Sequence, residues 1–188
     1  QVFGLNGADM TNPLTLSQSM TRLSGVVADA LEEAHQAALE RVNVLISEGG
    51  YDQELSLEAL DDQAGDTSYD VAYVLCAYSV SMEQLGTSQE DMARKLSSLA
   101  GKLFPVTYEV KTAEVQVEPD TSSENDGESS SGSTQTQTVS YLSATIHPLN
   151  QDAILDAFGL DPSESYGGLS LTCGEAVTNM ATALKLTL

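Results

Sequence analysis

The residues best suited to chemistry are two cysteines, two histidines and a large excess of carboxylates. Cys173 lies at the predicted start of a helix, where the helix dipole can lower the pKa of a thiol. His35 and His147 are the available bases, and no catalytic motif surrounds either of them. Without CxxC spacing or a nearby histidine pair, zinc binding and thioredoxin-type chemistry have no support. At Cys76 we expect a buried, inert thiol, with a disulfide as the alternative.

The best stretch for calcium binding contains Asp61, Asp62, Asp66 and Asp70. It lacks the alternating ligand spacing and the terminal Glu of an EF-hand loop. We therefore interpret these acids as solvated loop residues, and calcium binding stays the weaker alternative. From the sequence we assign no catalytic, cofactor-binding or metal-ligating residue.

Charge excludes two classes of partner. The chain carries 7 Lys and Arg against 28 Asp and Glu, which gives a formal net charge of −21. Nucleic acids and anionic membrane surfaces both require clustered basic residues. Two long blocks, 42–93 and 112–184, contain no Lys or Arg at all. Any anionic partner should therefore approach along the predicted helices 17–47 and 88–103, which hold five of the seven basic residues.

Apolar periodicity predicts three helices in the first half of the chain. Residues 17–47 repeat apolar side chains at steps of three and four, and Gly49-Gly50 ends the pattern. This helix could pack along its whole length or project as a stalk. Two core helices, 70–84 and 88–103, follow, and Pro105 stops the second.

The period then changes to two, which predicts a β-hairpin. One strand begins at Val106 and shifts its apolar face near Thr112, as a bulge would do, and its partner covers 138–147. Residues 118–137 between them form a low-complexity hairpin tip. One or two C-terminal helices follow, the first capped by Asn150. The predicted fold is a single α+β domain over 17–188, preceded by an N-terminal segment 1–16, with the helices packed on a small antiparallel sheet.

The order of these elements resembles the membrane-proximal region of cell-wall hydrolases carried by conjugative elements of Firmicutes. Four segments carry the resemblance: Gly49-Gly50-Tyr51-Asp52, and the ranges 69–78, 90–96 and 139–146. In that family a transmembrane helix precedes a domain of this layout, and a CHAP-, NlpC- or lysozyme-like catalytic domain follows. The catalytic residues of such domains do not carry over, because no motif surrounds Cys173, His35 or His147.

The resemblance implies a non-catalytic extracytoplasmic module of a Gram-positive cell envelope. Such a module would position a peptidoglycan hydrolase, with peptidoglycan or envelope proteins as partners, or would contact proteins of the conjugation machinery. The chain opens without an initiator Met, so we expect a segment of a longer secreted or membrane-anchored protein, with its anchor and catalytic domain elsewhere. Two alternatives remain: the segment is itself a peptidoglycan hydrolase using Cys173 or a carboxylate pair, or it is a surface adhesion module. Its oligomeric state is open.

Overall fold

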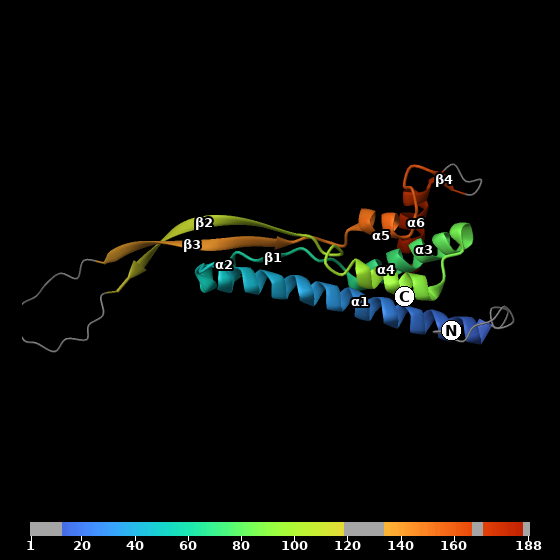
Figure 1. Ribbon diagram of the computed structural model, residues 1–188, viewed down its shortest axis with the longest axis horizontal. Helices are drawn as coiled ribbons and strands as arrows, with labels where there is room; N and C mark the ends of the chain where they lie inside the picture. Colours follow the sequence, from blue (N-terminus) through green and yellow to red (C-terminus); the bar gives the residue numbers. More distant parts are fainter. Residues whose placement is uncertain (1–12, 119–133, 167–170, 186–188) are drawn as a thin grey trace, which may run out of the picture.

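The computed structural model describes residues 13–118, 134–166 and 171–185. The protein is an elongated α+β molecule with a helical body at one end and a long β-hairpin at the other (Figure 1). Most of the predicted tip 118–137 and of the predicted segment 1–16 lies outside these residues. Where those ranges are described, regular structure begins earlier than predicted, because a helix starts at Pro13 and a strand at Gln135.

Helix α1 (Pro13–Glu48) confirms the predicted long helix and extends it by one turn at its start. Proline suits a first helical position, since its missing N–H would have no helical partner there. The buried side chains of α1 form one stripe that covers nearly the whole length over which its side chains are described. They are Leu23, Val27, Leu31, Ala34, Ala38, Val42 and Ile46. Over residues 21–48, where its side chains are described, the helix therefore packs along its length, in agreement with the first of the two alternatives.

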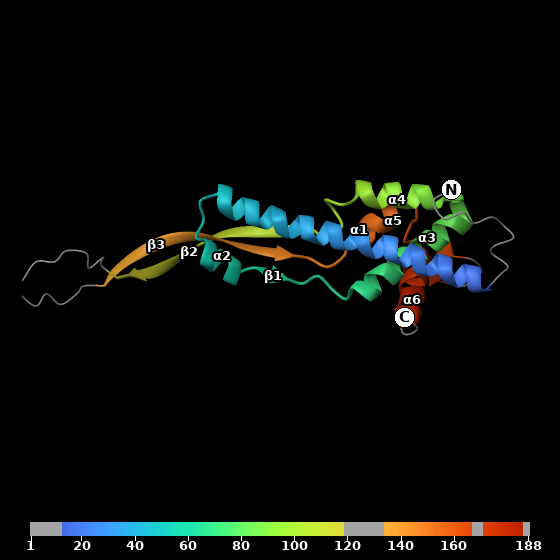
Figure 2. The same ribbon diagram turned by 90° about the horizontal axis from the view of Figure 1, so that it is seen from below.

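The buried stripe of α1 winds around the helix. Most of its steps are four residues, and at about 100° per residue each such step overshoots a full turn by about 40°. The first part of α1 consequently faces helices α3 and α4, and its last part faces α2 and strand β3 (Figures 1 and 2).

Helix α2 (Gln53–Glu58) fastens the end of α1 to the sheet. The Ser56 hydroxyl, which is fully buried, donates to the backbone oxygen of Asp52 at 2.5 Å and accepts from the backbone N–H of Leu142 at 2.9 Å. The backbone N–H of Asp52 also donates to the carbonyl of Ser140 at 2.8 Å. These bonds give partners to backbone groups on the flank of β3 that no neighbouring strand covers.

Helices α3 (Thr67–Leu85) and α4 (Gln89–Ser98) are the two predicted core helices. Every residue of α3 from Asp70 to Tyr78 is buried, because α1 and α6 both contact this helix. Helix α4 begins with a capping box between Ser88 and Asp91. It ends five residues before the predicted Leu103, since the chain turns at Gly101, a poor helix former, to enter the next strand.

The sheet has three strands in the order β1-β3-β2. Strands β2 (Val106–Val117) and β3 (Gln135–Ile146) pair antiparallel without interruption, from Val106 opposite Ile146 to Val117 opposite Gln135. The prediction of a bulge near Thr112 is therefore wrong. The apolar pattern shifts there because the outer half of the hairpin has no buried side chain to fix its face. The short strand β1 (Asp61–Asp62) pairs parallel to the end of β3, where we predicted a loop.

The C-terminal part returns to the helical body. Helix α5 (Gln151–Ala157) is capped by Asn150 as predicted, and α6 (Cys173–Lys185) begins at Cys173, the predicted helix start. Two short strands, β4 (Ser165–Tyr166) and β5 (Leu171–Thr172), pair between these helices.

Replacing Ser56 by Ala should destabilise the protein. The change leaves the Leu142 N–H buried without its acceptor, and such a loss costs about 1–3 kcal/mol. Equilibrium urea unfolding measures the effect. The control is Ser97→Ala on the exposed side of α4, which should change the free energy of unfolding by less than about 0.5 kcal/mol. Equal effects of the two substitutions would contradict the bridging role of Ser56.

Candidate functional site

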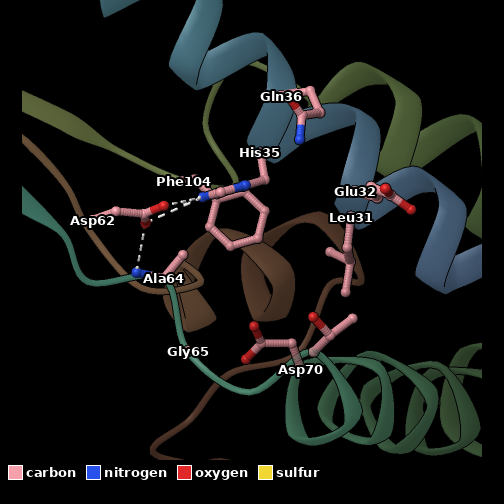
Figure 3. Close-up of a pocket in the computed structure, with 10 residues that line it drawn as sticks. Leu31, Glu32, His35, Gln36, Asp62, Ala64, Gly65, Asp70 and Phe104 are labelled. Atoms are coloured by element: carbon pink, nitrogen blue, oxygen red, sulfur yellow. Dashed lines mark hydrogen bonds and ion pairs between the residues drawn. The ribbon is translucent and has the colours of Figure 1, made fainter. Parts of the chain in front are cut away.

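A pocket of about 410 Å³ lies where the helical body meets the sheet. Its walls come from the middle of α1, from β1 and the loop after it, from the start of α3 and from the turn before β2 (Figure 3). The polar side chains in the lining are Glu32, His35, Gln36, Asp62, Thr67 and Asp70, and the apolar ones include Leu31 and Phe104.

A histidine–carboxylate pair forms one wall. His35 Nε2 lies 3.2 Å from Asp62 Oδ1 and 3.1 Å from Asp62 Oδ2. The Asp62 side chain also accepts from the backbone N–H of Ala64 at 3.1 Å. The imidazole meets the buried ring of Phe104 edge to face, with 5.4 Å between the ring centroids. Two neighbours therefore fix the orientation of His35.

Two carboxylates at the start of α3 have pKa values shifted in opposite directions. Asp66 caps the helix by accepting from the Ser68 N–H at 2.9 Å, and its Oδ2 lies 2.6 Å from Lys185 Nζ. The hydrogen bond from Lys185 holds the pKa of Asp66 below its ordinary value. Asp70, one turn further, is only 8% exposed. Loss of hydration, with the nearby charge of Asp66, raises the pKa of Asp70 to about 6, although Lys185 acts in the opposite direction.

The structure does not support an activated thiol at Cys173. This residue does start α6, as expected, but it is only 3% exposed. Burial and the neighbouring charges of Glu164 and Asp161 raise its pKa, contrary to the expected lowering by the helix dipole. The Cys173 N–H already donates to the Glu164 carbonyl at 2.6 Å. Cys76 is buried and free, as preferred from the sequence, and so is Cys173.

The two histidines lie in separate places. His35 is paired with Asp62, whereas His147 follows β3 with its Nε2 2.7 Å from the Thr107 hydroxyl. Neither is hydrogen-bonded to a cysteine in the described part of the chain.

The four acids considered for calcium have different partners. Asp61 accepts from Gln63, Asp62 pairs with His35, and Asp66 pairs with Lys185, while Asp70 lines the pocket. Within residues 13–118, 134–166 and 171–185, no three His, Cys, Asp or Glu side chains are grouped so that they could hold a metal ion. The described residues therefore give the calcium alternative no site.

Comparison with protein-family models, curated proteins and solved structures found no match. None of the chain's helices, over the residues that the structure describes, combines the length and the apolar character needed to cross a membrane.

Sequence reasoning named His35, Asp62 and Asp70 separately but did not place them around one pocket. One signal was available for Asp70. It lies four residues before Val74 and eight before Tyr78, on the apolar face of the predicted helix that is expected to pack into the core. A carboxylate on such a face is rare unless it has a partner. The contribution of Phe104 had no local signal, because it depends on the turn after α4.

Replacing Asp70 by Asn should stabilise the protein at pH 7. A folded-state pKa of about 6 against an ordinary 3.8 means that ionisation of Asp70 opposes folding. This cost is absent below pH 3.8, grows as pH rises toward 6, and is complete above it. The variant should gain on the order of 2 kcal/mol at pH 7 and nothing at pH 3.5, by urea unfolding.

The matched control is Asp66→Asn, for which the sign reverses. A lowered pKa contributes stability above the ordinary value, so this variant should be less stable than the wild type at pH 7 and indistinguishable from it at low pH. A loss of stability at pH 7 in both variants would contradict the assignment of Asp70.

Both thiols should resist alkylation in the folded protein. Burial raises the pKa of Cys76 from 9.0 to about 11, which lowers its thiolate fraction at pH 8 about 100-fold. Cys173 has its pKa raised as well. Mass spectrometry after iodoacetamide treatment should show both residues unmodified in buffer and both modified in urea. Rapid labelling of Cys173 in buffer would instead revive the catalytic interpretation.

Proposed function

We propose that this chain is a non-catalytic extracytoplasmic module that positions a peptidoglycan hydrolase at the cell envelope or contacts proteins of a conjugation machinery. The projecting hairpin is the observation that carries the proposal. Strands β2 and β3 extend past the end of α1, while the first turns of α1 and all of α6 lie at the opposite end (Figures 1 and 2). A module held at its helical end would present the hairpin to a partner at a distance from that end.

Strand β2 offers the contact surface. It is the edge strand of the sheet, so one flank of its backbone has no partner strand within the described chain. Tyr108 and Val110 lie opposite Ala144 and Leu142, which places all four side chains on one face. Ala144 and Leu142 are buried, whereas Tyr108 and Val110 are 60% and 51% exposed. An extended segment of a partner could pair with this edge and cover both side chains.

The charge of the molecule favours partners that are not anionic. With a net charge of −21, the surface repels polyanions and attracts basic protein segments over about one Debye length. Glu109 and Glu114 lie on β2 itself, and only Lys111 among the residues of this strand is basic. Envelope proteins with basic extended segments are therefore better partners than teichoic acids.

Two assays test the proposal. The purified chain is sedimented with Gram-positive peptidoglycan sacculi, and a photoreactive residue at position 109 traps protein partners in living cells. We expect binding in at least one assay, with no release of soluble wall fragments. Release of fragments, as in a lysozyme control, would support the hydrolase alternative. Failure of both binding assays would contradict the proposal.

The double variant Tyr108→Ser, Val110→Ser tests the edge of β2. Both side chains are more than half exposed, so the fold should persist while binding falls at least tenfold. The control is Val44→Ser, which is also 50% exposed but belongs to α1 and not to strand β2. Its binding should equal that of the wild type.

A further inference from the structure

Three carboxylates face the pocket between the helical body and the sheet, and among the described lining residues His35, which pairs with Asp62, is the one basic side chain. Glu32 comes from α1, Asp62 from β1 and Asp70 from α3. No Lys or Arg belongs to the described lining. Glu32 and Asp62 are exposed, while Asp70 is buried. The pocket therefore has negative charge both at its mouth and at its inner end.

The Asp70 carboxylate is the unexplained group in this pocket. The residue as a whole is only 8% exposed, and Figure 3 shows its carboxylate directed into the hollow between α1 and the β1–α3 loop, where the carboxylate oxygens meet the solvent of the pocket. No hydrogen bond or ion pair reaches it from any residue that the structure describes. The nearest cation, Lys185, is occupied by Asp66 at 2.6 Å and by the ring of Tyr69, whose centroid lies 5.5 Å away. A carboxylate that has lost most of its hydration and has gained no partner is costly.

We propose that this pocket binds an organic cation, an ammonium or guanidinium group, with the Asp70 carboxylate at its inner end and Glu32 and Asp62 at its mouth. The cation supplies the hydrogen-bond donors and the positive charge that Asp70 lacks. The Gln36 amide and the edge of Phe104 complete the wall around the group and its carbon stem.

The chemistry of the lining selects this class of ligand over others. Anions are repelled by three carboxylates. A bare metal ion needs several ligand atoms gathered around one point, and the described residues offer no such group. A volume of about 410 Å³ lies within the range of small-ligand sites, ~300–1,000 Å³. The cation can come from a basic side chain of a partner protein or from a free amine.

The charged groups around Asp70 define how binding depends on pH. They are Glu32 and His35 on α1, Asp62 on β1, Asp66 at the helix cap and Lys185 on α6. Since Lys185 stays with Asp66 and His35 with Asp62, ionisation of Asp70 controls the innermost charge. Binding should strengthen from pH 5 to pH 7, and bound cation should lower the titration midpoint of Asp70.

Calorimetry at pH 7 and low salt tests the proposal with matched probes. They are the N-acetyl methylamides of arginine and lysine, their neutral counterparts citrulline and norleucine, and putrescine. We expect at least one cationic probe to bind and both neutral probes to fail. Binding of the amino-acid amides indicates a protein side chain as the source, and binding of putrescine alone indicates a free amine. Equal heats from cationic and neutral probes, or none from any cation, would overturn the proposal.

Substitutions locate the binding group. Asp70→Asn should weaken binding of the cationic probe at least tenfold, whereas Asp61→Asn should leave it unchanged, because the Asp61 carboxylate bonds to Gln63 and does not line the pocket. Unaltered binding by Asp70→Asn would refute the site. A second measurement avoids dependence on the variant: carboxyl ¹³C NMR of the wild type should show the Asp70 midpoint fall when the cationic probe is added. A fixed midpoint with saturating probe would also refute it.

Discussion

One winding stripe of apolar side chains on α1 holds the two ends of the molecule together. Its buried side chains, from Leu23 to Ile46, all belong to one core cluster, and the helix contacts α3 and α4 as well as α2 and β3. A stripe that ran straight would face only one of these units. Most successive buried residues of α1 are four positions apart, so the stripe rotates around the helix axis along the chain. The same helix can therefore pack against both the helical body and the sheet. The pocket lies near the middle of this helix, where one unit gives way to the other.

Two neighbouring carboxylates at the pocket differ sharply in their partners. Asp66 has an ion pair, and Asp70 has none within the described residues. Asp66 and Asp70 are one helical turn apart, and both lie near the positive end of α3. Lys185 reaches Asp66 but leaves Asp70 to the interior. Burial and the charge of Asp66 raise the pKa of Asp70, although an acid in the first turn of a helix is ordinarily favoured in its charged form. Local conflicts of this kind concentrate at sites that bind other molecules.

The elements that follow a strong period were predictable from sequence. The long helix, the first core helix and the hairpin were confirmed because their apolar residues recur with the period of a helix or of a strand. Features without such a signal were missed. Strand β1 has two exposed residues and exists through its pairing with β3. The false bulge at Thr112 came from a stretch where neither face is buried. The pocket was not predicted, because Phe104 and Asp62 contact His35 only through tertiary packing. Such contacts leave no local pattern in the sequence.

The buried side chains of the hairpin are Leu142, Ala144 and Ile146, all at its inner end. Beyond Thr112 and Ser140, over the described residues 113–117 and 135–139, the two strands pair only with each other. Residues added there in opposing pairs would leave the body unchanged and would extend its reach by about 3.4 Å per pair. A residue added to one strand alone would move every following side chain of that strand to the opposite face of the sheet. The outer hairpin can therefore change in length by paired insertions, whereas the register between β2 and β3 has to be kept.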